Sequence, residues 1–99
     1  MTHSSFNLIP EYRLEKMVVI LKAVAHPVRL QIANILLNSE CQVGELIKVL
    51  STGQSLTSQE LSKLKLYGVL KSRRDGNKVY YSIKNNSIKN ILATIVSEV

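Results

Sequence analysis

The chain has 99 residues, 45% of them hydrophobic and 20% charged, which suits one folded domain and excludes most multi-domain architectures. Thirteen Lys and Arg against seven Asp and Glu give a net charge of +6. This charge favours a polyanionic partner, with a merely basic protein as the alternative. No apolar run approaches the roughly 20 residues of a membrane span, and the first residues do not resemble a secretory signal. We therefore expect a soluble, cytoplasmic protein with no membrane association.

The first part of the chain predicts a lead-in followed by a long helix. Residues 1–10 are polar and irregular, and we expect them to be a flexible segment before a single domain spanning 11–99. Between Glu11 and Ala25 the apolar residues recur at helical spacing and cover more than one face. One face can pack on the core of the domain, so the other requires a second partner.

Three further helices are expected at residues 28–37, 43–50 and 54–67. Pro27 suits the first turn of the second helix, and we expect His26 to cap that helix or pack at its start. Gly68 is expected to end the fourth helix, because glycine readily adopts the left-handed conformation of a C-terminal cap.

Beyond Gly68 the pattern changes to that of a β-hairpin. Residues 69–74 and 77–83 are expected to form two strands joined by a turn at Asp75-Gly76. Asn85-Asn86-Ser87 can cap a last helix that carries a single apolar stripe. The order α-α-α-α-β-β-α predicts a mainly α (α+β) fold, a winged helix-turn-helix.

The fourth helix and the hairpin carry the functional signal. The helix has a polar stripe at i, i+3, i+4 and i+7, and its start is suited to phosphate binding. The hairpin places cations around its tip, where they can reach phosphates or the minor groove. An ordinary solvated helix face and an edge strand protected by charge are the alternatives. The expected DNA-binding residues are Gln54, Ser55, Ser58, Gln59, Ser62, Arg73, Arg74 and Lys78.

Over residues 14–96 the chain resembles the ArsR/SmtB family of bacterial dimeric winged-helix repressors. The resemblance lies in residues 21–32 (LKAVAHPVRLQI), 43–46 (VGEL), 54–61 (QSLTSQEL) and 74–83 (RDGNKVYYSI). It implies a homodimer formed by the first and last helices, which binds an inverted-repeat operator in double-stranded DNA and is released by an inducer. It also implies base or phosphate contacts from the fourth helix and wing contacts from the hairpin cations.

The chain departs from the metal-sensing members of that family. Members that sense soft metals often place Cys-x-Cys where this chain has Cys41-Gln42-Val43, and zinc-binding members use Asp and His on the last helix. Residues 87–99 contain neither of those two ligands. We expect no metal and no cofactor, and the inducer is left open. The sequence also lacks the motifs of a catalytic site, so we expect no enzyme.

Two single residues leave alternatives open. Glu60 stands where the family commonly has His, and its charge either turns inward or excludes some DNA sequences. The presence of Glu60 on this helix also favours an alternative function, a winged-helix protein-interaction module that lacks specific DNA readout. A DNA-binding regulator without an inducer is a third alternative. Cys41 is a redox-sensing candidate, although redox-sensing relatives generally use two cysteines; the alternative is an inert, buried side chain.

Overall fold

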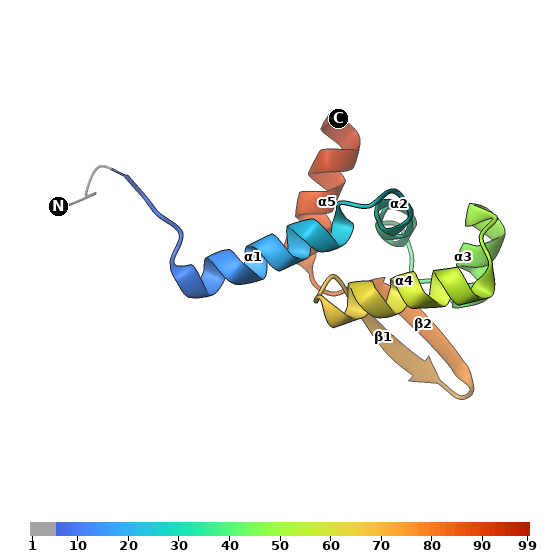
Figure 1. Ribbon diagram of the computed structural model, residues 1–99. Coiled ribbons are helices and arrows are strands. Elements are labelled where there is room, and N and C mark those ends of the chain that lie inside the picture. Colours follow the sequence, from blue (N-terminus) through green and yellow to red (C-terminus); the bar gives the residue numbers. More distant parts are fainter. Residues whose placement is uncertain (1–5) are drawn as a thin grey trace.

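The computed structural model describes residues 6–99, in which five helices and one hairpin follow the predicted order (Figure 1). The elements are α1 (Glu11–Val24), α2 (Pro27–Leu36), α3 (Val43–Leu50), α4 (Gln54–Leu66), β1 (Leu70–Asp75), β2 (Lys78–Ile83) and α5 (Asn86–Glu98). This order confirms the predicted winged helix-turn-helix. In the expected lead-in, residues 1–5 lie outside the described part of the chain, and residues 6–10 form no helix or strand.

The helix ends have local causes that the sequence pattern indicated. His26 caps α2, with its Nδ1 accepting a hydrogen bond from the Arg29 backbone N–H at 3.5 Å. Asn85 caps α5 in the same way, its Oδ1 accepting from the Ile88 N–H at 2.9 Å. At the end of α4, Gly68 has a φ of +85°, and the Val69 N–H bonds back to the Leu64 carbonyl. This is the expected glycine cap.

The hydrophobic core lies where α2 meets α4, α3 and the hairpin. Its most deeply buried members come from all of the first four helices and from the start of the hairpin, so no single helix could form it alone. The most deeply buried hydrophobic side chains are Ala23, Ile32, Ala33, Leu46, Leu61, Leu64, Val69 and Leu70. Burial of one side of α4 leaves its opposite side in solvent. In Figure 1 the helix lies beside the hairpin.

The hairpin register corrects the expected turn by one residue. Asp75 pairs with Lys78, so the two turn residues are Gly76 and Asn77 rather than Asp75-Gly76. Gly76 has a φ of +64°, while Asn77 keeps a negative φ. A two-residue hairpin with glycine in its first turn position is the type II′ arrangement, which suits the twist of the strands. The register puts Arg73 and Lys78 on one face of the hairpin and Arg74 on the other.

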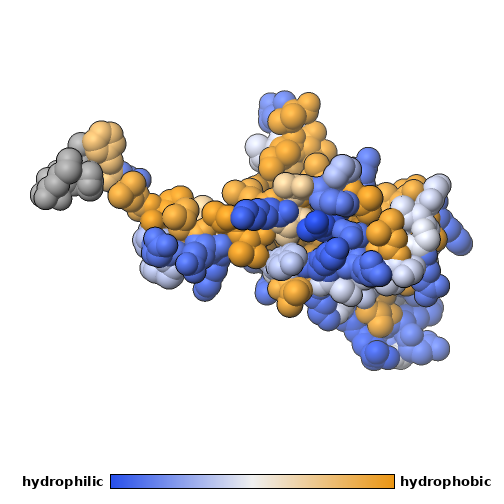
Figure 2. Space-filling model, in the orientation of Figure 1, coloured by the Kyte–Doolittle hydropathy of each residue, from blue (hydrophilic) through white to orange (hydrophobic). Residues whose placement is uncertain are grey.

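Helices α1 and α5 expose much of their apolar surface. In α1 only Ala23 and Val24 are buried, and in α5 only Ile88 and Leu92. Figure 2 shows hydrophobic residues along both helices, whereas hydrophilic residues surround the hairpin tip. Among residues 6–99 no single helix is long and apolar enough to span a membrane; the pair α1 and α2 passes only when taken together, across a bend of 97°.

Candidate nucleic-acid interface

The polar stripe predicted on α4 lies on the exposed side of that helix. All five of its expected DNA contacts are exposed: Gln54, Ser55, Ser58, Gln59 and Ser62. The buried residues of α4 lie on its other side: Thr57, Glu60, Leu61 and Leu64. This arrangement fits a helix that packs on the core by one side and presents amides and hydroxyls on the other. Direct contact of these five residues with DNA stays a prediction.

The start of α4 is fixed by hydroxyl groups rather than by apolar packing. Thr57 is fully buried, and its Oγ1 donates to the Gly53 carbonyl at 2.9 Å. The Thr52 hydroxyl oxygen lies 2.6 Å from Thr57 Oγ1, within hydrogen-bond distance. These bonds satisfy the hydroxyl of a fully buried side chain. Gly53 itself caps α4 without a side-chain hydrogen bond, so the first-turn N–H groups face an exposed, anion-favouring helix end.

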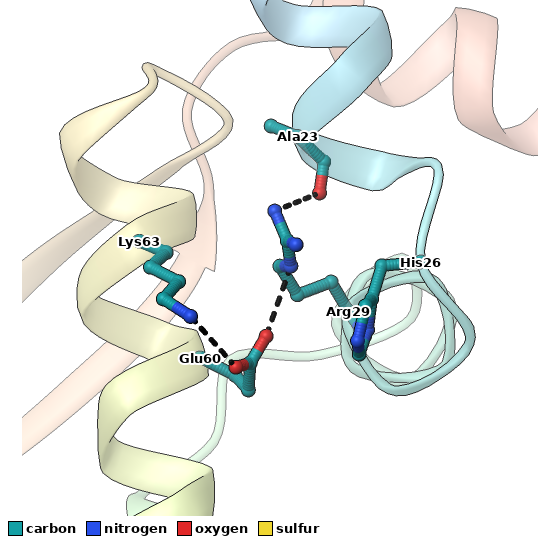
Figure 3. Close-up of polar contacts among 5 residues, drawn as sticks. All are labelled: Ala23, His26, Arg29, Glu60 and Lys63. Atoms are coloured by element: carbon teal, nitrogen blue, oxygen red, sulfur yellow. Dashed lines mark hydrogen bonds and ion pairs between the residues drawn. The ribbon is translucent and has the colours of Figure 1, made fainter.

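Glu60 turns inward, which decides between the two alternatives that the sequence left open. The residue is only 4% exposed, and its Oε2 lies 2.9 Å from Arg29 Nε of α2 (Figure 3). Lys63 approaches the other carboxylate oxygen at 3.4 Å. The exposed face of α4 is therefore free of this negative charge. The main sequence argument for a protein-interaction module without DNA readout no longer holds.

The hairpin cations differ in whether they are paired with a carboxylate. Arg73 pairs through its guanidinium with Glu40, Nε lying 3.0 Å from Oε2, and stacks 4.5 Å over the Tyr80 ring. The hydrogen bond from Arg73 lowers the pKa of Glu40, and the same bond raises the pKa of Arg73. Arg74 and Lys78 are exposed and make no ion pair among the described residues.

The Glu40–Arg73 pair and a second polar contact were not predicted from the sequence. Glu40 is 33 residues away from Arg73 along the chain, and no local pattern connects the two. Lys65 on α4 donates to the Ser72 hydroxyl of β1 at 2.7 Å. This contact joins the end of α4 to the hairpin, so the two predicted DNA-binding elements are held relative to each other.

Arg74→Ala is expected to weaken binding to specific and random duplexes alike, because a free cation on an exposed wing contacts phosphates rather than bases. The slope of log affinity against log salt concentration should fall by about one phosphate contact. Arg73→Ala should change that slope less, since the Arg73 guanidinium already pairs with Glu40. Salt titrations of DNA binding measure both slopes. An unchanged slope in Arg74→Ala would remove Arg74 from the interface.

Cys41 is a packed side chain of the core. It is 6% exposed, and its backbone N–H and carbonyl pair with Tyr81 of β2 at 3.0 and 2.8 Å. Burial raises the pKa of the Cys41 thiol, which disfavours the thiolate needed for oxidation. These features fit the inert alternative better than a redox sensor. Within residues 6–99 no three His, Cys, Asp or Glu side chains cluster as metal ligands.

Alkylation of Cys41 by iodoacetamide at pH 8 is expected to be at least about tenfold slower in the folded protein than in urea. The physical reason is that the raised pKa reduces the thiolate fraction and the fold blocks access to the sulfur. Mass spectrometry of timed samples measures the two rates. Equal rates would restore Cys41 as a sensor candidate.

An exposed polar stripe on α4, a basic hairpin beside it and a core that holds the two together define a winged helix-turn-helix DNA-binding protein. Residues 26–72 match the family described as "Bacterial regulatory protein, arsR family". The chain is 38% identical over 82 residues to the HTH-type transcriptional regulator YgaV of Escherichia coli, covering 82% of this chain and 83% of that protein. The chain belongs to the ArsR family and is a DNA-binding transcriptional regulator.

Solved structures support the same assignment. HlyU from Vibrio cholerae superposes with a TM-score of 0.83 at 35% identity, covering 89% of this chain and 96% of that one. The transcriptional repressor PagR of Bacillus anthracis superposes with a TM-score of 0.81 at 37% identity, covering 87% and 99% of the two chains. HlyU is described as a transcriptional activator and PagR as a repressor.

Proposed function

We propose that this protein is a homodimeric cytoplasmic repressor that binds an inverted-repeat operator, and that it is neither an enzyme nor a metal sensor. The observation that carries the proposal is the exposed row of amides and hydroxyls on α4 beside the free wing cations Arg74 and Lys78. Amides and hydroxyls can bond to base edges, while the cations bind phosphates. The description of PagR as a repressor supports the direction of regulation.

The apolar surface of α1 and α5 supports the homodimer. Between the two helices lies a groove with a cavity volume of about 120 Å³. It is lined entirely by apolar side chains: Met17, Ile20, Leu21, Val24, Ile88, Ile91, Leu92 and Ile95. Covering these residues with a second copy would remove them from water and join two α4 helices in one dimer. The operator half-sites would then lie about 10 base pairs, or a small multiple of that, apart.

The proposal is tested by incubating the purified protein with fragmented genomic DNA and sequencing what it retains, with and without peroxide. Recovery of an inverted repeat supports the proposal, and transcription from the recovered promoter, measured with and without the protein, separates repressor from activator. A folded dimer that retains no common motif would overturn it in favour of the protein-interaction module. Loss of binding under peroxide alone would assign a sensing role to Cys41.

Gln59→Ala is expected to lower affinity for the operator by about 5- to 150-fold, because a bidentate amide contact to a base contributes about 1–3 kcal/mol. Affinity for random duplex should change much less, since nonspecific binding depends on phosphate contacts. Fluorescence anisotropy with both duplexes measures the two losses. Gln31→Ala makes the same change on an exposed position of α2 and should leave both affinities near the parent values. Equal losses on both duplexes would remove Gln59 from base contact.

A further inference from the structure

One nearly buried ion-pair network joins three helices of the domain. Arg29 of α2 extends its Nε to 2.9 Å from the Glu60 carboxylate of α4, and its Nη1 donates to the Ala23 carbonyl of α1 at 3.0 Å. Figure 3 shows the Arg29 side chain lying between the end of α1 and the middle of α4. The backbone N–H of the same arginine is bound by His26, the cap of α2. Arg29 therefore contacts α1, α2 and α4 at once.

Stability alone is a poor explanation for this network. The Glu60 side chain is 5% exposed and that of Arg29 is 17% exposed, so both charges have lost most of their water. Desolvation offsets much of the attraction within such a pair, and apolar side chains of similar volume often stabilise a fold equally well. A buried ion pair differs from an apolar contact because separating its members leaves two desolvated charges without partners, which is strongly unfavourable.

The need to keep these two buried charges together constrains the rotation of α4. Glu60 follows Gln59 directly and lies on the opposite, buried side of the helix from the polar stripe. Any rotation of α4 about its axis moves the Glu60 carboxylate away from Arg29 and turns the stripe by the same angle. The hydrogen bond from Arg29 to the Ala23 carbonyl connects the orientation of α4 to the last turn of α1. Helix α1 carries exposed apolar side chains that belong to the proposed dimer surface.

We propose that Arg29 and Glu60 are positioning residues, which set the angle at which α4 presents Ser58 and Gln59 and couple that angle to α1. The inference goes beyond the proposed function and rests on it only for its DNA readout. The contacts of Arg29 with Glu60 and with Ala23 are present in the free protein, where they hold α4 against α2 and α1. Their loss should therefore lower the discrimination between operator and random DNA more than it lowers overall DNA affinity.

Two variants separate positioning from simple charge compensation. Glu60→Gln keeps the size of the side chain and removes its charge. Arg29→Lys keeps the positive charge, but a single ammonium replaces the two separate nitrogens that approach Glu60 and donate to the Ala23 carbonyl. Glu98→Gln, at an exposed position of α5, makes the same change in net charge as Glu60→Gln far from the network. Circular dichroism and thermal melting first establish the temperature at which every variant is fully folded.

The first measurement is hydrogen exchange of the α4 backbone amides in the free, folded protein. In Glu60→Gln and Arg29→Lys we expect α4 to exchange about tenfold faster while α3 stays close to the parent. The Glu98→Gln control should match the parent in both helices. Unchanged α4 exchange in both variants would overturn the proposal, and this result does not depend on DNA binding.

The second measurement is the ratio of affinities for the selected operator and for a random duplex. We expect both variants to lose about tenfold in this ratio while the random-duplex affinity stays within about threefold of the parent. A parental ratio in Arg29→Lys would show that the pair serves charge compensation alone and would overturn the proposal. A parent protein that binds no DNA would overturn the proposed function, leaving the exchange data to decide the positioning role.

Discussion

Ile91→Glu is expected to convert the proposed dimer into a monomer and to lower operator affinity by at least about a hundredfold. Ile91 is 52% exposed in the protomer and lines the apolar groove between α1 and α5. A carboxylate there would have to be buried without a partner when a second copy covers the groove. The fold of one protomer should be preserved because the side chain is not part of its core. Each monomer would then bind a single half-site and would lose the affinity that a dimer gains when its second α4 binds the other half-site.

Analytical ultracentrifugation measures the mass of Ile91→Glu, and fluorescence anisotropy measures its affinity for a full operator and for an isolated half-site. The matched control is Asn90→Glu, which adds the same charge at the neighbouring position of α5, outside the apolar groove. This control should remain a dimer and should bind the full operator far better than Ile91→Glu. A variant Ile91→Glu that stays dimeric and keeps parental operator affinity would place the dimer surface elsewhere.

Leu64→Ala should lower the free energy of unfolding by about 2–5 kcal/mol, the usual result of removing a fully buried leucine side chain. Leu64 lies on the buried side of α4 and has no exposed surface. The loss combines reduced apolar burial with an unfilled cavity beneath α4. Because α4 carries the polar stripe on its other side, operator binding should fail at a lower temperature in this variant than in the parent.

Urea unfolding at a fixed protein concentration measures this loss, and the fixed concentration matters because dimer stability depends on it. Leu66→Ala is the matched control: it changes the same residue type two positions along α4, where the side chain is 78% exposed. Its free energy of unfolding should stay within about 0.5 kcal/mol of the parent value. Equal losses in the two variants would contradict the assigned packing of α4.

Two features of the charge distribution favour the proposed DNA-binding surface. Arg74 on the hairpin is exposed, and Glu60 of α4 is buried. Arg74 makes no ion pair among the described residues, whereas Arg73, its neighbour on the opposite hairpin face, pairs with Glu40. Glu60 is taken from the surface of α4 by Arg29. The Arg29–Glu60 pairing withdraws negative charge from the exposed stripe of α4, which favours an approach to phosphates.

The order of the elements, most of the helix ends and the polar stripe follow from the sequence alone. Apolar spacing separates helices from strands, and His26, Asn85 and Gly68 mark helix ends through short-range hydrogen bonds or backbone freedom. Helical spacing also places Ser55 and Gln59 on one side of α4. These features depend on residues only a few positions apart, so their physical causes are visible in the linear pattern.

The hairpin register, the inward orientation of Glu60 and the pairing of Arg73 required the tertiary structure. The turn at Gly76-Asn77 rather than Asp75-Gly76 depends on how Leu70 and Ile83 align across the two strands on the core. Glu60 has its partner Arg29 on another helix, and Arg73 has its partner 33 residues earlier in the chain. A charged side chain selects its partner by distance in space, and the linear sequence does not contain that distance until the helices have packed.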